Sequence, residues 1–587
     1  MGGIAGIHSL STALDSDELA ALGDGIASRQ GDTAILARPR STLARNARFT
    51  VAVAGHFDRA PASGQSAAET LLEHWARSGI DALGQFEGAW VAAIHDHDRR
   101  ALHLLRDPFG IRRIYFVRKG TRLAFSSRIA TLLDLPWVSR ELARENLSEY
   151  LAFRYVHAPR TLLHDVQALP AGHHLRFAGD VRIEPWFKLR YAPPYAPLPD
   201  DPSTLEELER RLNRAVAARA SGKERVGVFL SGGLDSTALT LFASRLGPVH
   251  TFTVGATDSD GDETPYAGRV ASLLRSHHEV LRVDFTQFAD SLDTVIAGSD
   301  QPLTDPAAIP QYLLARAARP HVDVILAGDG GDEIFGGRMV AAMATEFRVS
   351  GTLARLPGGL RDLAAGAFSG SRPELRDPGV PFGLARLIGG AHIFSRDARA
   401  GLLRDPGWVR PGIRRACLEP LYREVTSDPI NEILYAYLRG RMAEDALPRS
   451  GAATGLVGLA LREPLLDRDL VSWCARLPGH WKVRRTPLQG VMSKWPLREL
   501  LRPVLGRALV QRPKRVLPGP WRAWLGGAGG DFQRERVARL KEDRLNLFLP
   551  GAIDGLVQRL DQPGADAQLW ALFFLDGWAR NLGLIRA

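Results

Sequence analysis

A short apolar run that ends in two glycines constrains the fold more than any other feature of the chain. Residues 226–230 have the composition of a buried strand, Ser231, Gly232 and Gly233 follow, and helical spacing begins at Ser236. A buried strand that turns directly into a helix is typical of a parallel α/β sheet. Glycines let backbone N–H groups approach a polyanion, and the helix N-terminus adds the positive end of its dipole. The pattern predicts a phosphate-binding loop without the lysine of a Walker A motif, and a plain strand–helix turn is the alternative.

Two more apolar runs, at residues 250–254 and 322–327, predict further strands of the same sheet. The second run leads into a glycine-rich turn with three carboxylates, Asp329 and Asp332 among them. Ligands of parallel sheets bind where the carboxyl ends of the strands meet. Because clustered carboxylates repel one another unless they share a cation, we expect Mg²⁺ between Asp332 and Asp235. A solvated acidic turn is the alternative.

The remainder of the chain divides into regions of different character. Up to about residue 190, short strand-like runs with period-2 alternation and frequent turns predict stacked antiparallel sheets. Residues 191–203 are rich in proline, lack periodicity and are typical of a linker. Residues 204–587 contain the strand–helix alternation and become mostly helical beyond about Arg338. We therefore expect a first domain at 1–190, a linker at 191–203 and a second domain at 204–587.

Composition argues against some classes of partner. The net charge is +10, but it is spread along the chain without a basic run, so we expect no nucleic-acid partner. An anionic substrate benefits from such a field equally well. No uninterrupted apolar run of about 18 residues and no signal peptide is evident, so we expect a cytoplasmic protein without a membrane span. The two cysteines, Cys417 and Cys474, are expected to be buried free thiols.

Several motifs together resemble the asparagine synthetase family. Its pyrophosphate loop is similar to Ser231-Gly232-Gly233-Leu234-Asp235-Ser236, and its second ATP and magnesium motif is similar to Gly328-Asp329-Gly330-Gly331-Asp332-Glu333. Further matches are Asp262-Glu263-Thr264-Pro265-Tyr266-Ala267 with His278-Glu279, Gln301-Pro302 with Asp305-Pro306, Arg462-Glu463-Pro464-Leu465-Leu466-Asp467, Lys494-Trp495-Pro496-Leu497-Arg498 and Arg512-Pro513-Lys514. The resemblance covers nearly the whole chain. It implies that ATP is cleaved to AMP and pyrophosphate as a substrate carboxylate attacks the α-phosphorus.

The same resemblance implies the fold class, which is α/β overall. We expect an α+β, Ntn-hydrolase-like αββα sandwich in the N-terminal part. An α/β adenine-nucleotide alpha-hydrolase domain should follow, with a parallel sheet and a helical C-terminal part.

The resemblance also assigns roles to single residues. Lys514 is expected to reach the adenylate and the tetrahedral intermediate, and Lys494 to approach phosphate, because an ammonium is a compact charge suited to oxyanions; two surface lysines are the alternative. Glu444 or Asp329 is expected to accept the proton that the attacking amine loses. Asp235 and Asp332 are expected to hold the metal. The expected nucleotide-binding residues are Leu230, Ser231, Gly232, Gly233, Asp235, Ser236, Val254, Ala327 and Gly328.

Residues 1–190 resemble the glutaminase half of the family, but they lack its nucleophile. The family chemistry needs a cysteine directly after the initiator Met, and Gly2 stands there in this chain. Where the family holds glutamine with an Asn-Gly-Glu segment, residues 53–58 read Val-Ala-Gly-His-Phe-Asp. We therefore expect a first domain that does not hydrolyse glutamine and serves as a structural or substrate-docking partner.

Members of the family that lack this cysteine close a ring within one activated substrate. They are the lasso peptide cyclases and the β-lactam or carbapenam synthetases. Holding the amine and the acyl-adenylate in one site replaces a diffusing nucleophile by effective molarity, which contributes up to about 7–11 kcal/mol. Residues 441–455 lack the Asp-Arg and Glu-x-Arg of asparagine synthetases, and β-lactam synthetases carry Tyr where Asp329 stands.

We therefore favour a lasso peptide cyclase, a macrolactam synthetase that joins an Asp or Glu side chain of a precursor peptide to the peptide's N-terminal amine. The alternatives are another amide ligase, either an ammonia-dependent asparagine synthetase or a β-lactam-type synthetase, and a scaffold without activity. The expected partners are the precursor peptide and a protease or recognition protein for its leader. The expected cofactors are ATP and Mg²⁺.

Overall fold

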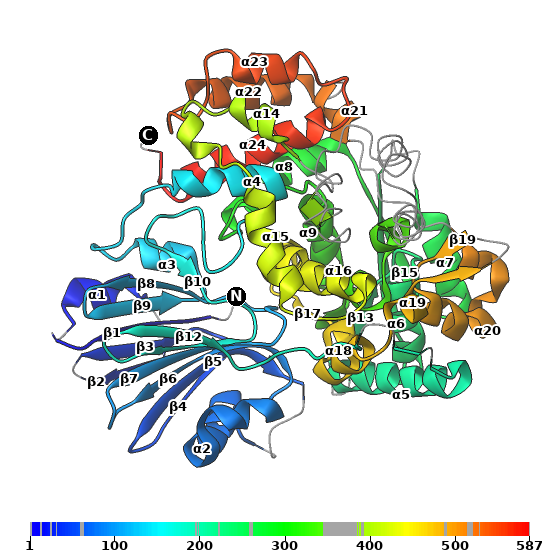
Figure 1. Cartoon of the computed structure of the whole chain (residues 1–587), viewed down its shortest axis with the longest axis horizontal. Helices are drawn as coiled ribbons and strands as arrows, with labels where there is room; N and C mark the ends of the chain where they lie inside the picture. The colour runs from blue at the N-terminus through cyan, green and yellow to red at the C-terminus, as the bar shows by residue number, and fades with distance from the viewer. Residues whose placement is uncertain are drawn as a thin grey trace, which may run out of the picture.

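A computed structural model describes residues 3–585 except 12–13, 24–25, 31, 59–63, 194–195, 198, 221–223, 257–261, 344–383, 385–386, 389–392, 487–489, 513–520 and 527–528. The described part has three regions (Figure 1): stacked antiparallel sheets near the N-terminus, a parallel sheet between helices, and a group of C-terminal helices.

The N-terminal region is a four-layer αββα sandwich, as predicted. Along strand β5 (Phe49–Phe57), Ala52 and Ala54 face the layer between the sheets, whereas Val51 and Val53 face helix α2 (Ala67–Ser78), as the period of two requires. Helix α2 (Ala67–Ser78) packs on β4 and β5, and helix α3 (Ile129–Leu133) packs on β8 and β9. The first sheet has the order β10 (Gln167–Ala168), β8 (Tyr115–Lys119), β9 (Arg122–Ser126), β1 (Ile4–Ser9), β3 (Thr33–Ala37), β2 (Ile26–Gln30), and the second β12 (Val181–Pro185), β11 (His173–Phe177), β7 (Ala101–Arg106), β6 (Gly88–Asp96), β5 (Phe49–Phe57), β4 (Ser41–Arg45).

The second sheet system is parallel and is buried on both faces. Val324 and Leu326 of β16 belong to one hydrophobic cluster, while Ile325 between them belongs to another on the opposite face. Helices α5 (Asp201–Ala220), α6 (Leu234–Ser244) and α7 (Thr264–Leu273) lie on the first face, and α9 (Ala308–Ala318) and α17 (Leu447–Gly455) on the second. The strand order is β15 (His277–Val283), β14 (His250–Ala256), β13 (Val226–Phe229), β16 (Val324–Leu326), β17 (Ala460–Arg462).

The strand order changes direction between β13 and β16, because β14 and β15 lie on one side of β13 while β16 and β17 lie on the other. Such a switch point opens a crevice at the carboxyl ends of the two strands. The two glycine-rich turns follow these two strands, as the sequence predicted. Strand β17 was not predicted; it lies within the region expected to be helical and pairs with β16 through Leu326 and Arg462.

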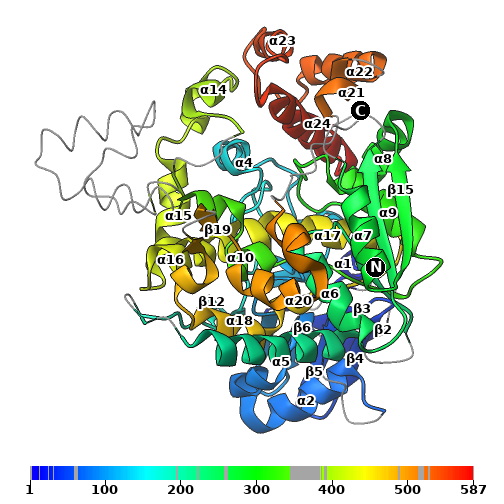
Figure 2. The same ribbon diagram turned by 90° about the vertical axis from the view of Figure 1, so that its right-hand side faces the viewer.

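Helices make up most of the described chain beyond β16. The last helix, α24 (Ala565–Asn581), contains the apolar residues whose helical spacing was evident in the sequence. Helix α5 begins at Asp201, so the last residues of the segment expected to be a linker are helical. The other described elements beyond β16 include α10 (Gly331–Phe335), α15 (Ile413–Arg423), α16 (Pro429–Tyr437), the π-helix Leu438–Ala446, α18 (Arg468–Ala475), α20 (Trp495–Gln511) and α22 (Gly530–Glu542), and helix α8 (Phe285–Ala297) precedes β16 (Figure 2).

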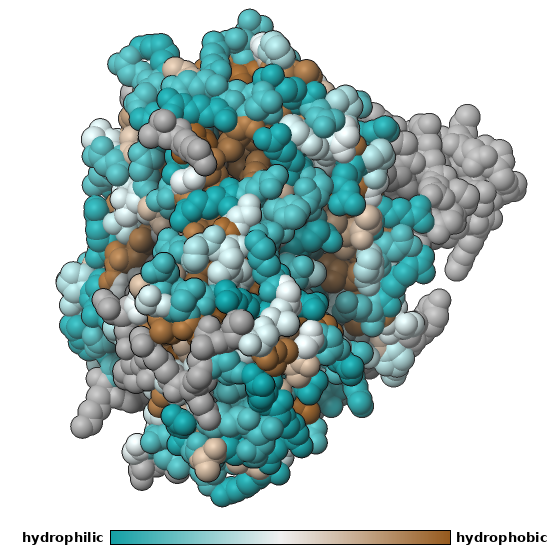
Figure 3. All heavy atoms as spheres, turned by 90° about the vertical axis from the view of Figure 1, so that its left-hand side faces the viewer, coloured by the Kyte–Doolittle hydropathy of each residue, from teal (hydrophilic) through white to brown (hydrophobic). Residues whose placement is uncertain are grey.

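None of the described helices is both long enough and apolar enough to cross a bilayer. On the face seen in Figure 3, hydrophilic residues predominate and hydrophobic ones show as separate patches. Scattered apolar patches of this kind are normal on a globular surface.

Candidate active site

The first glycine turn links β13 to α6 and borders a pocket. Gly232 has a φ of +69°, and a Cβ there would lie 2.9 Å from the backbone nitrogen of Ala267, so only glycine fits. The Ser231 and Ser236 hydroxyls lie 3.2 Å apart, and the backbone N–H of Gly233 donates to Ser231 Oγ at 3.3 Å. Among the described residues, no side chain caps the N-terminus of α6, which begins here. The turn therefore offers hydroxyls and helix N–H groups to an anion.

The second turn packs directly against the first. A Cβ on Gly331 would lie 2.2 Å from Asp235 Oδ1, and a Cβ on Gly328 would lie 3.1 Å from Asp235 Cβ. A Cβ on Gly337 would lie 2.5 Å from the Asp332 carboxylate. The glycines of this turn are thus what allows the two acidic side chains to come together.

Lys494 places a buried cation between these two carboxylates. Its Nζ forms ion pairs with Asp235 and, at 2.6 Å, with Asp332. Burial disfavours the ammonium, but the two carboxylates outweigh that effect and raise the pKa of Lys494. The residue has a φ of +53°, and its backbone N–H donates to the Gly336 carbonyl at 3.1 Å, which ties it to the second turn. One cation contacts both carboxylates, so the two groups lie close enough together to share a positive charge.

Arg512 closes the other side of the pocket. It donates to the Gly232 carbonyl at 3.2 Å, pairs with Glu263 at 3.1 Å, and stacks its guanidinium 4.0 Å from the centroid of the Tyr266 ring. Two of the motifs noted in the sequence, around Glu263 and around Arg512, therefore meet over the first turn. Lys514 and Gly2 lie outside the described residues.

Three of the expected nucleotide-binding residues lie in or directly after three adjacent strands. Leu230 follows β13 and donates its N–H to the Phe252 carbonyl at 2.9 Å, and Val254 is in the neighbouring strand β14. Ala327 follows β16 and donates its N–H to the Arg462 carbonyl at 3.1 Å. The fold thus brings them to one edge of the sheet, and their contact with a nucleotide stays a prediction.

Glu444 and Asp329, the two expected proton acceptors, lie in different surroundings. Glu444 is in the π-helix and accepts a 2.8 Å hydrogen bond from Arg113 of the sandwich, with Arg106 3.9 Å away. Asp329 is half-buried in the second turn. Arg449 is close enough to Asp329 for the two charges to interact. The role of either residue in proton transfer stays a prediction.

Two buried glutamates, Glu333 and Glu463, lie near the carboxyl edge of the parallel sheet and were not predicted as site residues. Glu333 is 7% exposed, and burial, with the charge of Asp332, raises its pKa to about 7. Glu463 is 4% exposed, and burial, with the charge of Asp329, raises its pKa to about 8. For Glu463, the signal available in the sequence was the short apolar run before Arg462, which forms the unpredicted strand β17.

The segment that replaces the family's glutamine-holding motif takes part in a buried ion-pair group between the two halves of the protein. Asp58 Oδ2 lies 2.5 Å from Arg219 of α5, and Arg219 lies 3.0 Å from Asp467. His56 Nε2 lies 3.3 Å from the other oxygen of Asp58. All three side chains of the Asp58–Arg219–Asp467 group are almost fully buried. The group fastens the sandwich to the end of β17, because Asp467 caps α18 just beyond it.

A cavity opens between the sandwich and the parallel-sheet region. The sandwich contributes Arg112 and Arg113, the segment after α4 (Leu147–Phe153) contributes Arg154, and the π-helix contributes Glu444 and its neighbour Asp445. The guanidinium of Arg112 makes no hydrogen bond or ion pair with the residues that the structure describes. We call this space the interdomain chamber. It can receive a polar or charged group larger than ammonia.

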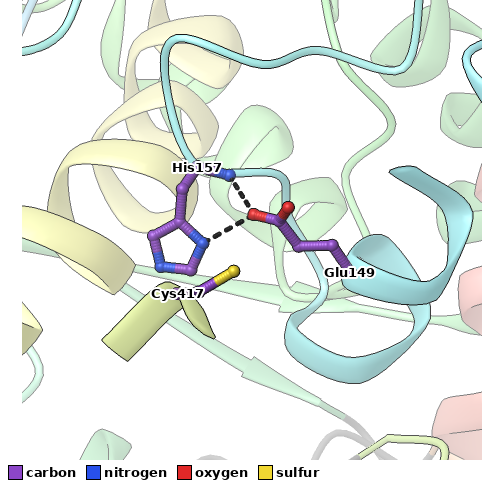
Figure 4. A group of neighbouring side chains, drawn as sticks. All are labelled: Glu149, His157 and Cys417. Carbon is purple, nitrogen blue, oxygen red and sulfur yellow. Dashed lines mark hydrogen bonds and ion pairs between the residues drawn. The ribbon is translucent and has the colours of Figure 1, made fainter. Parts of the chain in front are cut away.

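Glu149, His157 and Cys417 form a second polar cluster away from the phosphate pocket (Figure 4). Glu149 Oε1 accepts hydrogen bonds from the backbone N–H of His157 at 2.6 Å and from its Nδ1 at 2.7 Å. Arg160 Nε donates to Glu149 Oε2 at 2.9 Å, and another Arg160 nitrogen lies 3.5 Å from Cys417 Sγ. Burial also raises the pKa of the thiol to about 12. The arginine already supplies the cation, so the cluster braces α4 against α15 rather than forming a metal site.

Comparison with known proteins agrees with this geometry. The family model described as asparagine synthase matches residues 207–580, and that described as glutamine amidotransferase domain matches residues 56–187. A putative glutamine-hydrolyzing asparagine synthetase of Mycobacterium tuberculosis is 30% identical over 78% of this chain and 71% of its own length. The glutamine-hydrolyzing asparagine synthetase 1 of Bacillus subtilis is 26% identical, with 81% and 74% covered. An amidase of Penicillium rubens, chyE, is 24% identical, with 79% and 74% covered.

The order of the two matched models follows the order of the sandwich and the parallel-sheet region. The asparagine synthase model alone covers more than half of the chain. The chain therefore belongs to the asparagine synthase family and is an ATP-dependent, AMP-forming carbon–nitrogen ligase.

Proposed function

We propose that this ligase is a macrolactam synthetase of the lasso peptide cyclase type. It adenylates an Asp or Glu side chain of a precursor peptide, releases pyrophosphate, and lets the N-terminal amine of the same peptide displace AMP. The product is an isopeptide-bonded ring. The observation that carries the proposal is the buried Asp58–Arg219–Asp467 group, in which the former glutamine-holding segment serves as a domain contact.

The proposed reaction does not use ammonia from glutamine. Residues 1–190 contain no cysteine, since the two cysteines of the chain are Cys417 and Cys474. The carboxylate of Asp58 is turned toward Arg219 and is buried, so it is not offered to a small-molecule amine. An amine carried by the substrate itself then has to replace ammonia.

The interdomain chamber supports a peptide substrate. Its wall mixes cationic, anionic and tyrosine side chains, which suits backbone and side-chain groups of a polar peptide. Its basic residues include Arg112, whose guanidinium makes no hydrogen bond or ion pair with the described side chains. A carboxylate-bearing peptide is the substrate class that such a wall favours.

The nucleotide edge has the residues that adenylation requires. Asp235 and Asp332 would hold a Mg²⁺ ion, which neutralises charge on the phosphates when it is bound. The first turn would hold the pyrophosphate part, and Lys494 would move from the carboxylates to a phosphate oxygen. A leader-binding partner would deliver the precursor to the chamber.

The experiment is a screen of ATP–pyrophosphate exchange with Mg²⁺. The probes are L-aspartate with ammonium, L-aspartate with glutamine, and synthetic peptides with an N-terminal glycine and one internal Asp or Glu. We expect exchange with a subset of the peptides, together with a product lighter by one water and without a free N-terminus. We expect Asp235→Ala and Asp332→Ala to abolish exchange. Formation of asparagine from aspartate and ammonium, with no response to any peptide, would refute the proposal in favour of an ammonia-dependent synthetase.

A further inference from the structure

We propose that the carboxylate of Asp445 binds the primary ammonium group of the substrate inside the interdomain chamber. The inference rests on the proposed function, because it gives a place to the N-terminal amine that closes the ring. Asp445 follows Glu444 in the π-helix and was not predicted as a site residue.

The carboxylates of the chamber wall differ in whether the protein supplies them with a cation. The described wall includes three of them, those of Asp300, Glu444 and Asp445. Glu444 pairs with Arg113 at 2.8 Å, and Asp300 pairs with Arg128 at 3.0 Å. The side chain of Asp445 makes no hydrogen bond or ion pair with the residues that the structure describes. It is therefore the carboxylate of this wall that is available to a ligand.

The carboxylate of Asp445 is enclosed by protein but open to the chamber. The residue is 5% exposed, yet its two oxygens are not among the atoms that the protein seals from solvent. Because Asp445 belongs to the chamber wall, the space that these oxygens meet is the chamber. A largely desolvated carboxylate without a cation is unfavourable, and a cationic group of a ligand would offset that cost.

Arg449 comes close to Asp445 without taking the place of such a ligand. It forms an ion pair with Asp305 at 2.5 Å, and its charge interacts with Asp445 over a longer distance. Arg449 interacts in the same way with Asp329 of the second glycine turn. Since one side chain is near both carboxylates, the ammonium site lies near the turn beside which the acyl-adenylate would form.

The other neighbours of Asp445 suit an ammonium better than a metal ion. The charge of Asp445 acts on Tyr150 and Tyr155, and both tyrosines line the chamber. The Tyr150 hydroxyl donates to the Ala571 carbonyl at 2.9 Å, so it is not directed at Asp445. A Mg²⁺ or Ca²⁺ ion takes six or more oxygen ligands, whereas an ammonium is satisfied by fewer acceptors and is attracted to aromatic faces.

The sandwich side of the chamber provides the opposite charge. The guanidinium of Arg112 makes no hydrogen bond or ion pair with the described residues, and it does not pair with Asp445. The wall therefore offers an available anion and an available cation at separate places. A peptide with a free N-terminus and carboxylate groups carries a partner for each of them.

The test compares a peptide that has a free N-terminus with the same peptide acetylated there. Acetylation removes the ammonium and leaves every carboxylate in place. Binding is measured by calorimetry with Mg²⁺ and an ATP analogue whose α,β-bridge cannot be cleaved, so that no reaction follows. For a peptide active in the exchange screen, we expect acetylation to raise the dissociation constant of the wild type about 10-fold or more. In Asp445→Asn the free peptide should bind weaker by a similar factor, and acetylation should then make no further difference.

Asp300→Asn is the matched control, because it neutralises a carboxylate of the same wall that Arg128 already holds. It should keep the wild-type ratio between the two dissociation constants. Asp445→Asn should unfold at a temperature no lower than the wild type, since it removes a buried charge without an ion-pair partner among the described residues. A weaker binding of the free peptide would then not result from misfolding.

Unchanged binding of the free peptide by Asp445→Asn would overturn the inference. An equal loss for the free and the acetylated peptide would also overturn it, because the ammonium would then not be the group that Asp445 contacts. Absence of exchange with every peptide in the wild type would instead refute the proposed function. The ammonium would in that case come from a free amino acid, and L-aspartate with N-acetyl-L-aspartate replaces the peptide pair. No difference between these two ligands in the wild type would overturn the inference as well.

Discussion

Replacing Lys494 with methionine tests whether one cation holds the two site carboxylates together. Both carboxylates contact the same ammonium, so their nearest oxygens lie no more than about 5 Å apart, and their repulsion at an effective dielectric constant of about 20 is at least about 3 kcal/mol. If the proposed Mg²⁺ ion binds between the carboxylates, it has to displace the ammonium in the wild type. In Lys494→Met no such displacement is needed. We therefore expect Lys494→Met to be less stable by about 3 kcal/mol without Mg²⁺ and to bind Mg²⁺ up to about 100-fold more tightly.

The assay is thermal unfolding across a Mg²⁺ titration in the absence of nucleotide. Added metal should raise the unfolding temperature of Lys494→Met at lower concentrations than that of the wild type. Lys541→Met is the control, because Lys541 pairs with Asp554 on the surface and its side chain is 46% exposed. Identical Mg²⁺ dependence in Lys494→Met and wild type would refute the idea that the ammonium occupies the metal position.

Three further changes test other features. Gly331→Ala should abolish pyrophosphate exchange, because its Cβ would overlap the Asp235 carboxylate; Gly268→Ala, whose Cβ meets no atom within 4 Å, should leave exchange unchanged. Burial, and then the charge of its stacked neighbour His174, lower the pKa of His103 to about 3, below the value of about 6.5 in the unfolded chain. The unfolded chain therefore binds more protons as the pH falls, and this residue should cost about 2 kcal/mol of stability between pH 7 and pH 5. In denaturant unfolding, the free energy of unfolding of His103→Gln should fall by about 2 kcal/mol less than that of the wild type between pH 7 and pH 5. His480→Gln should behave as wild type. Arg219→Met should lower the unfolding free energy by about 3–5 kcal/mol, since it leaves two buried carboxylates uncompensated, and an unchanged value would show that the Asp58–Arg219–Asp467 group does not hold the halves together.

The parts of the fold that follow from local pattern could be predicted from the sequence. The runs that became β13, β14 and β16 are apolar and bounded by glycine or helical spacing, so both turns at the carboxyl edge were found. Strand β17 could not be found, because it is three residues long and forms only by pairing with β16, which is more than a hundred residues earlier in the chain. These three residues form a strand because of a tertiary contact and not because of their local sequence.

The same distinction applies to the site. Asp235 and Asp332 lie in motifs whose glycines reveal them, and their approach in the structure agrees with the shared-cation hypothesis. That Lys494 would stand between them does not follow from spacing, since it belongs to a different part of the chain. The partners of Asp58 and the surroundings of Glu463 likewise depend on how the two halves pack, and no period or motif in one chain encodes that packing.

The late position of β17 in the chain has a consequence for synthesis. A nascent polypeptide emerges from its N-terminus, so the sandwich and the strands β13 to β16 are available to fold well before residue 460 leaves the ribosome. Until then the exposed edge of β16 lacks its neighbour, and the N–H of Ala327 lacks the Arg462 carbonyl to which it donates. A ribosome-bound chain stopped before residue 460 should therefore not yet retain ATP, whereas one stopped after the last helix should.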